Sequence, residues 1–430
     1  MRLLHTSDWH LGRTLHGVDL IEHQAAYLDH LVELVRTERV AAVLVSGDVY
    51  DRAIPPVEAV ALLSQTLARL AEHTTVVLTP GNHDSALRLG FGAALMRDRV
   101  RVRTSVAEVT DPVVLSDDEG EVLVYALPYL DPDVARPALA RALGILRGPA
   151  RDGDAGASDG TDVAGPVVLT RSHEAVLAAA LELVRADLDQ RVARAVRLGA
   201  PRPRSVVMAH AFVVGGEPSE SERDIRVGGA DHVPAGVFAG IDYVALGHLH
   251  GPQQITAPPA AGTDGAVSGR PTGMLRYSGS PLAYSFSEVH QHKSTVLLEL
   301  GATGGAGVTL VPAPVPRRLA EVSGPLDELL GERGAPHVDD WLRVTVTDAH
   351  RPADLYRRVK DRFPHALVVQ HRPRDRVGAA VGTAAVTAAQ DPLVVAAEFV
   401  EHVTGARPTE AEQAVLRRAY EQVVAAERSA

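Results

Sequence analysis

The chain has 430 residues, 46% of them hydrophobic and 23% charged, which suits a folded protein of two or three domains. It contains no cysteine, so disulfides and thiolate metal sites are excluded. The net charge of −11 argues against a broadly basic nucleic-acid surface. No apolar stretch is long enough to cross a membrane, and the N-terminus lacks the apolar core of a signal peptide. We therefore expect a cytoplasmic protein.

Strands and helices alternate in the first part of the chain. Strands are expected at 2–6, 43–47 and 76–78, and helices at 19–37 and 55–70. This alternation indicates a parallel sheet. Short β-rich pieces between residues 100 and 128 then predict a second sheet.

The middle of the chain contains two segments without apolar periodicity, 148–166 and 256–273, which we interpret as flexible inserts. Between them a long helix is expected from His173 to Leu198, followed by strands that end at His210 and at Gly247. Two later strands are expected at 274–277 and 294–300.

Prolines at 312–316 suggest a linker into a small α/β domain over residues 316–372. Its expected elements are a strand at 318–323, a helix at 325–331, a strand at 341–347, a helix at 353–362 and a strand at 366–370. An Ala/Gly/Thr-rich tether follows at 373–390.

The last segment, residues 391–430, is predicted to form two helices. Asp391 caps the first, and Thr409 with Glu412 forms a capping box for the second. Apolar residues recur along one face of each helix. They could pack on the chain's own core, but the preceding tether favours docking on a partner protein.

Five apolar runs end in residue types that bind metals. The second run leads into Ser46-Gly47-Asp48, and glycine allows the backbone to turn sharply there. Parallel strands present ligands at their carboxyl ends, so these residues should meet at one edge. The runs lead into Asp8 and His10, into Asp48, into Asn82, His83 and Asp84, into His210, and into His248 and His250.

The mixture of imidazole, carboxylate and amide groups suits manganese, iron or zinc better than calcium. Asp48 has two oxygens and could bridge two cations. Two cations about 3.5–4 Å apart stabilise both the attacking and the leaving oxygen of a phosphoryl transfer. Taken singly, Asp8 could be a helix cap and His210 a core histidine, but the ordered set favours metal binding.

In this order, the motifs DxH, GDxxD, GNHD, a lone His and GHxH resemble those of the calcineurin-like metallophosphoesterases. Residues 5–13 (HTSDWHLGR) and 277–281 (YSGSP) resemble, more narrowly, the SbcD subunits of SbcCD DNA nucleases. The resemblance covers roughly residues 1–300 strongly and the rest loosely. It implies a four-layer α/β/β/α sandwich over residues 1–312, with a small α/β cap domain and a C-terminal helical tail.

The resemblance also implies roles for single residues. His83 would be catalytic, assisting the leaving oxygen or stabilising the phosphate charge, and Asp84 would orient its ring. Arg13, His16 and Arg52 would lie on the rim, where they could contact DNA or be solvated loop residues. One metal would be held by Asp8, His10, Asp48 and His250, and the other by Asp48, Asn82, His210 and His248.

The implied function is that of a manganese-dependent DNA nuclease subunit, an exonuclease on duplex ends and an endonuclease on hairpins and single strands. It would act in DNA repair, recombination and replication, with a second SbcD-type copy and an SbcC-type ATPase. The chain has no G-x-x-x-x-G-K-[ST] loop, so ATP hydrolysis must come from that partner. The alternatives are a phosphoesterase for nucleotides or other small phosphates and a non-catalytic DNA-end scaffold. The scaffold is disfavoured because no ligand position is missing.

Overall fold

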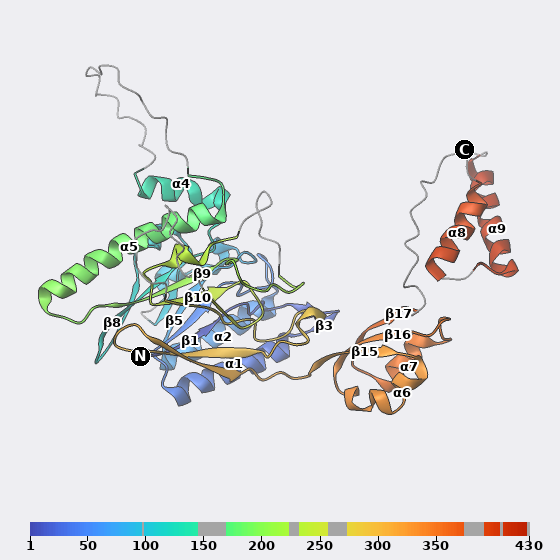
Figure 1. Ribbon diagram of the computed structural model, residues 1–430, viewed down its shortest axis with the longest axis horizontal. Helices are drawn as coiled ribbons and strands as arrows, with labels where there is room; N and C mark the ends of the chain where they lie inside the picture. Colours follow the sequence, from blue (N-terminus) through green and yellow to red (C-terminus); the bar gives the residue numbers. More distant parts are fainter. Residues whose placement is uncertain are drawn as a thin grey trace, which may run out of the picture. The chain divides into compact units, whose positions relative to one another are not determined.

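The computed structural model describes residues 1–96, 99–144, 169–222, 232–256, 273–373, 391–404 and 407–427. They fall into two compact units, Met1–Arg372 and Pro373–Ala430 (Figure 1). Apart from their edges, the expected inserts at 148–166 and 256–273 and the expected tether at 373–390 lie outside the described residues.

The first sheet has six strands in the order β14-β13-β1-β4-β5-β6. Its four parallel strands are β1 (Arg2–Thr6), β4 (Ala42–Ser46), β5 (Thr75–Thr79) and β6 (Val100–Val102). The antiparallel strands β13 (Ser294–Leu300) and β14 (Ala306–Pro312) complete it. The expected strands of the first part of the chain are therefore confirmed, and they share one sheet.

The second sheet also has six strands, in the order β11-β12-β10-β9-β8-β7. These are β7 (Val113–Asp117), β8 (Gly120–Ala126), β9 (Arg204–His210), β10 (Tyr243–Gly247), β11 (Gln253–Ile255) and β12 (Met274–Tyr277). Strands β8, β9, β10 and β12 run parallel.

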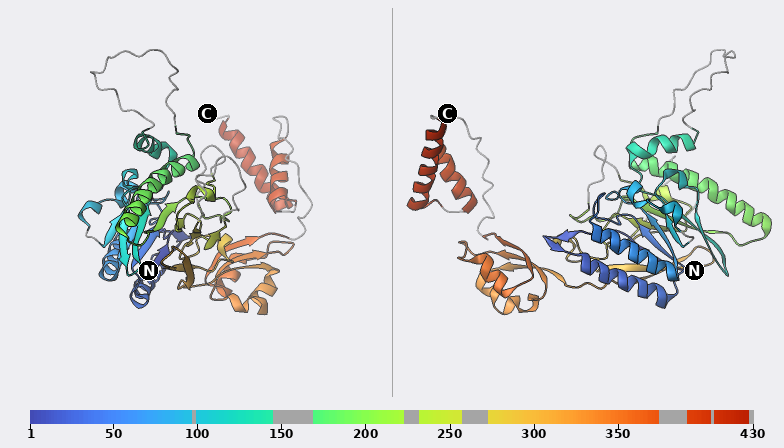
Figure 2. Two further views of the ribbon diagram at one scale, coloured as in Figure 1. Left: turned by 60° about the vertical axis from the view of Figure 1, so that its left-hand side comes forward. Right: turned by 180° about the vertical axis from the view of Figure 1, so that it is seen from behind.

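The two sheets pack face to face, and helices cover both outer faces (Figure 1 and Figure 2). Helices α1 (Ile21–Glu38) and α2 (Val57–His73) cover the first sheet, and α4 (Pro132–Ala142) and α5 (His173–Leu198) cover the second. Strand β4 shows why this works: Val43 and Val45 pack toward α1 and α2, whereas Ala42 and Leu44 face the other sheet. The strand is therefore apolar on both faces, as a buried parallel strand must be.

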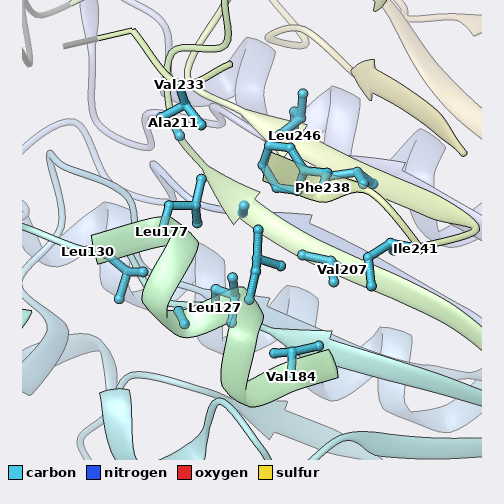
Figure 3. Close-up of a cluster of buried hydrophobic side chains, with 14 of the residues drawn as sticks. Leu127, Leu130, Leu177, Val184, Val207, Ala211, Val233, Phe238, Ile241 and Leu246 are labelled. Carbon is cyan, nitrogen blue, oxygen red and sulfur yellow. The ribbon is translucent and has the colours of Figure 1, made fainter. Parts of the chain in front are cut away.

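The core beneath α5 is built in the same way on the other side. Leu177 and Val184 of α5 pack against Val207 of β9 and Phe238 of the short helix η3 (Ala235–Phe238), as Figure 3 shows. These layers confirm the predicted α/β/β/α sandwich.

Helix α1 begins at Ile21 rather than at residue 19. A short hairpin, β2 (Thr14–Leu15) and β3 (Val18–Asp19), occupies the positions before it. The side chain of Asp19 accepts a 2.9 Å hydrogen bond from the N–H of Ile21. The remaining short elements of the sandwich are α3 (Ala86–Leu89), η1 (Ala93–Leu95), η2 (Val106–Glu108) and η4 (Phe286–Glu288).

The small α/β region has a three-stranded parallel sheet in the order β15-β16-β17. Its elements are β15 (Leu319–Gly324), α6 (Leu326–Leu330), η5 (Glu332–His337), β16 (Trp341–Val346), α7 (Leu355–Arg362) and β17 (Ala366–His371). Helix α7 starts two residues later than expected because Asp354 has a left-handed backbone, with φ of 51°.

This region packs on the sandwich through a small apolar cluster that includes Leu319 and Trp341 together with Leu20 and Phe286. The guanidinium of Arg343 also lies 4.4 Å from the ring centre of Phe286.

The C-terminal unit contains α8 (Pro392–Thr404) and α9 (Glu410–Glu427), as expected. Asp391 caps α8 by accepting a 2.9 Å hydrogen bond from the N–H of Leu393. The capping box is confirmed, since Thr409 donates its backbone N–H to Glu412 at 2.8 Å. No helix in the described part of the chain is both long and apolar enough to cross a membrane.

Candidate metal centre

The predicted ligands follow β1, β4, β5, β9 and β10, and glycines let their loops approach one another closely. A Cβ atom on Gly81 would lie 2.1 Å from Oδ1 of Asp48. A Cβ atom on Gly247 would lie 1.8 Å from the carbonyl oxygen of Ser46. Both distances are far below any allowed contact, so only glycine fits at these two positions.

Four predicted ligands have left-handed backbones: φ is 54° at Asp8, 44° at His10, 48° at Asp48 and 109° at His248. Such values are uncommon outside glycine and tend to gather at functional sites. Hydrogen bonds between loops hold this geometry. The N–H of Asp8 donates to the carbonyl of Gly47, and the N–H of His10 to that of Asp48, both at 3.0 Å.

One group of donors consists of Asp8, His10 and His250, whose possible ligand atoms all lie within 4.8 Å of one another. The Nε2 atoms of His10 and His250 are 3.1 Å apart. The carboxylate of Asp8 accepts hydrogen bonds from the hydroxyl of Ser7 and from the N–H of His248, the latter at 3.1 Å. The three side chains of this group are buried.

A second group of donors consists of Asp8, Asp48 and His210, again within 4.8 Å. Nδ1 of His210 lies 3.0 Å from the carbonyl oxygen of Ser46, to which it can donate, and this turns Nε2 toward the site. That Nε2 lies 2.9 Å from Oδ1 of Asn82. His248 is also buried here, with its ring centre 5.3 Å from that of His210.

Asp48 belongs to the second group and also approaches His10 of the first. Its Oδ2 is 3.7 Å from Nε2 of His10 and 3.4 Å from Nε2 of His210. Burial alone would raise the pKa of Asp48, but His210, His10 and His83 hold it well below its usual value. A buried carboxylate that stays ionised among imidazoles is suited to a shared cation ligand.

Two observations indicate that these side chains are suited to bind divalent cations. Burial keeps the pKa values of His10 and His248 well below normal, so both rings are neutral and present a lone pair. The Nε2 atoms of His10 and His210 also both face Oδ2 of Asp48, at 3.7 and 3.4 Å. Neutral imidazole beside carboxylate and amide oxygens is a donor set for first-row divalent metals.

His83 and Asp84 both contact the loop that follows β4. Nδ1 of His83 lies 2.7 Å from the backbone carbonyl oxygen of Asp51. The Asp84 carboxylate accepts from the backbone N–H groups of Val49, Tyr50 and Gly81 and so fixes the β5 loop on the β4 loop. The role of Asp84 in orienting His83 stays a prediction. Burial raises the pKa of Asp84 to about 7.

The three predicted DNA contacts have different surroundings. Arg52 and His16 are exposed. The side chain of Arg13 is only 16% exposed, donates a 3.0 Å hydrogen bond to the carbonyl of Ser221 and lies over the ring of Tyr284. Arg13 is therefore tied to the site wall more than to solvent.

Sequence analysis did not single out Ser221, Glu288 or Lys293, which surround His250. The Ser221 hydroxyl is 2.7 Å from Nδ1 of His250 and 2.6 Å from Oε1 of Glu288. Lys293 forms a buried ion pair with Glu288. Single residues in irregular segments, far apart in sequence, form no motif that could have revealed them.

Comparison with known families agrees with this geometry. Residues 1–130, which carry Asp8, His10, Asp48 and Asn82, match the family of calcineurin-like phosphoesterases. Residues 315–404 match the family SbcD_C, described as the type 5 capsule protein repressor C-terminal domain. The two matches together support an SbcD-type nuclease.

Two solved structures are also similar. The crystal structure of TT1561 of Thermus thermophilus is 12% identical, with coverage of 72% of this chain and 98% of that chain and a TM-score of 0.35. GAP50, the anchor in the inner membrane complex of Plasmodium, is 9% identical, with coverage of 73% and 85% and a TM-score of 0.34. Scores this low carry no conclusion about fold or function.

Proposed function

We propose that this chain is the nuclease subunit of an SbcCD-type complex and hydrolyses DNA phosphodiester bonds. The observation that carries the proposal is the convergence of buried Asp and His donors and the partly buried Asn82 from five strand ends around Asp48. It would act as an exonuclease on duplex ends and as an endonuclease on hairpins and single strands, in cytoplasmic DNA repair, recombination and replication.

The seven predicted ligands divide into two sets that share Asp48. Asp8, His10, Asp48 and His250 would hold one cation, and Asp48, Asn82, His210 and His248 the other. When bound, two divalent cations, expected to be manganese, would stabilise the oxygens that enter and leave phosphorus. The proximity of Asp48 Oδ2 to both His10 and His210 supports this division.

His83 is our candidate for the catalytic acid or charge stabiliser. Its Nδ1 can donate to the Asp51 carbonyl, and its Nε2 faces Asp48 at 3.9 Å. The ring is buried, so a proton on Nε2 would be held beside the proposed bridging carboxylate and shielded from bulk water. Arg13, His16 and Arg52 remain our candidates for DNA contacts, with Arg13 the most enclosed of the three.

A phosphoesterase for nucleotides or other small phosphates is the alternative, because the same ligands would serve both substrates. The test compares linear and supercoiled plasmid DNA with bis-p-nitrophenyl phosphate, using purified protein in Mn²⁺. Cleavage of plasmid DNA that EDTA abolishes would support the proposal. Hydrolysis of the small ester without any DNA cleavage, even with the ATPase present, would favour the alternative.

The C-terminal helices carry features expected of a segment that binds another protein. We propose that residues 391–430 dock on the SbcC-type ATPase, with 373–390 as the linker, 316–372 as the cap and 1–312 as the nuclease domain. On α8 and α9 several apolar side chains are exposed: Val394 (49%), Phe399 (65%), Val403 (58%), Val415 (57%) and Tyr420 (39%). Soluble monomers seldom leave so many apolar groups together in water, so a partner groove would cover them.

We also propose a homodimer through an apolar patch near the start of α2 and the α3–η1 segment. Its exposed members are Ile54 (68%), Val57 (78%), Leu87 (87%), Phe91 (87%) and Leu95 (88%). A groove of about 380 Å³, lined by Val60, Leu89 and Met96 among others, lies beside it. A two-fold dimer through this patch would remove these apolar side chains from water.

A further inference from the structure

The surroundings of His250 contain a hydrogen-bonded chain that no motif indicated. Glu288 is 1% exposed and accepts from Lys293 through Oε2 and from the Ser221 hydroxyl through Oε1. The N–H of Tyr284 also donates to Oε1, at 3.1 Å. With Lys293 as its counter-ion, Glu288 is a carboxylate and can only accept hydrogen bonds.

These contacts set the direction of the hydrogen bonds around His250. The Ser219 hydroxyl donates to Glu222 at 2.7 Å, and the Ser221 hydroxyl, which lies 2.7 Å from Ser219 Oγ and 2.6 Å from Glu288 Oε1, donates to the charged carboxylate. The Ser221 oxygen then accepts from Nδ1 of His250 at 2.7 Å, and the same Nδ1 lies 3.4 Å from Glu288 Oε1, which can only accept. Nδ1 of His250 therefore carries the ring hydrogen, and Nε2 presents its lone pair where it lies 3.1 Å from Nε2 of His10.

The backbone of His250 is held by the same group of residues. Its carbonyl accepts a 3.0 Å hydrogen bond from Lys293 Nζ, and its N–H donates to Glu222 at 2.8 Å. The ring can therefore neither rotate nor change tautomer without breaking buried, charge-assisted hydrogen bonds. The Nδ1 atom of His210 faces the backbone carbonyl of Ser46 instead of a side chain. A side-chain substitution therefore cannot remove the hydrogen-bond partner of His210, as it can for His250.

We propose that Ser221 and Glu288 are positioning residues that hold His250 in the tautomer and orientation required of a metal ligand. This rests on the proposed role of His250 as a ligand of one of the two cations. Partners of this kind typically change metal affinity by about 10–100-fold. Since His250 belongs to only one ligand set, the effect should fall on one cation and spare the other.

The test is calorimetric titration of the metal-free full-length chain with Mn²⁺. For Ser221→Ala, which leaves the Glu288–Lys293 ion pair in place, one of the two ions should bind about 10–100-fold more weakly and the other with unchanged affinity. Ser221→Thr restores the hydroxyl and should restore the binding. Ser116→Ala, which removes an exposed hydroxyl on β7 far from His250 in the sequence, is the matched control and should bind both ions like wild type.

A second readout needs no metal. In the metal-free chain labelled with ¹⁵N-histidine, His250 should show the Nδ1–H tautomer, and Ser221→Ala should shift it toward a mixture. His250→Ala assigns the signals.

Two results would overturn the inference. One is a folded Ser221→Ala chain with wild-type affinity for both ions, and the other is a Ser221→Thr chain that binds as weakly as Ser221→Ala. If instead His250→Ala keeps both ions at wild-type affinity, the ligand assignment itself is wrong, and this inference falls with it.

Discussion

The backbone N–H of His83 donates a 2.9 Å hydrogen bond to Oδ1 of Asp48. The candidate catalytic residue is thus anchored on the candidate bridging carboxylate. Oδ2 of the same group is the oxygen that faces His10 and His210. The position of His83 and the geometry of both proposed cation sites therefore depend on one side chain.

Asp48→Asn should lose both cations, because a neutral amide cannot bridge two positive ions among buried imidazoles. Metal analysis of the purified variant after exposure to Mn²⁺ is the measurement. Asp118→Asn, at an exposed turn, provides the control for loss of one carboxylate. Retention of two ions per chain by Asp48→Asn would show that Asp48 does not bridge them.

His83→Ala should keep both cations and lose about 10²–10⁴-fold in cleavage rate, as expected for a positioned acid or charge stabiliser. Rates are compared at saturating Mn²⁺ on one DNA substrate. His73→Ala, at an exposed histidine at the end of α2, should cleave like wild type. A His83→Ala rate within a few-fold of wild type would remove His83 from the reaction.

Much of this site could be predicted because its signals are local. An apolar run, a glycine and a polar residue in sequence mark a strand end, and five such strand ends define the ligand set. The glycine before Asn82 shows why the pattern is specific, since a side chain on Gly81 would overlap Asp48.

The parts that could not be predicted depend on contacts between distant segments. Ser221 and Glu288 are 67 positions apart and meet only after β10 and η4 are in place. The hydrogen bonds of Asp84 are a second example. Its sequence neighbour is His83, but its hydrogen bonds go to the backbone of Val49 and Tyr50 in another loop.

Truncation after Arg374 should leave a core that folds, binds manganese and cuts single-stranded DNA. Copurification with the SbcC-type ATPase, and any stimulation of duplex cleavage by ATP, should disappear because the exposed apolar face of α8 and α9 is lost. Pull-down with the purified ATPase measures this directly. Unchanged affinity for the truncated chain would mean that these helices do not dock the partner.

Phe91→Glu combined with Leu95→Glu should convert a dimer into a monomer, because two charges would face the partner copy across the patch. Light scattering after size-exclusion chromatography measures the mass. Val196→Glu is a matched control, since Val196 is 71% exposed on α5 and outside the patch. A monomeric wild-type chain, or a double variant that remains dimeric, would contradict the proposed interface.

Asp117→Asn should destabilise the sandwich by about 1.5–3 kcal/mol at neutral pH, the usual contribution of hydrogen bonds to a charged group. Its partner Arg204 is fully buried and binds Asp117 through both Nη atoms. Hydrogen bonding from Arg204 lowers the pKa of Asp117 to about 2. This folded-state value lies below that of the unfolded chain, about 3.9.

The stabilisation from Asp117 should therefore be complete above about pH 4 and disappear as the pH falls toward 2. Thermal unfolding of both chains at several pH values measures the difference. Asp118→Asn, at the neighbouring exposed carboxylate, should unfold like wild type throughout. A difference in stability that does not shrink on acidification would show that the Asp117 charge is not its source.

The most direct test of the central claim is anomalous diffraction at the manganese edge from crystals grown with Mn²⁺. The proposed site predicts two peaks about 3.5–4 Å apart on either side of Asp48. One peak should lie within bonding distance of His10 and His250, and the other within bonding distance of Asn82 and His210. A single peak, or peaks that do not share Asp48, would contradict the two-cation centre on which the proposed nuclease function rests.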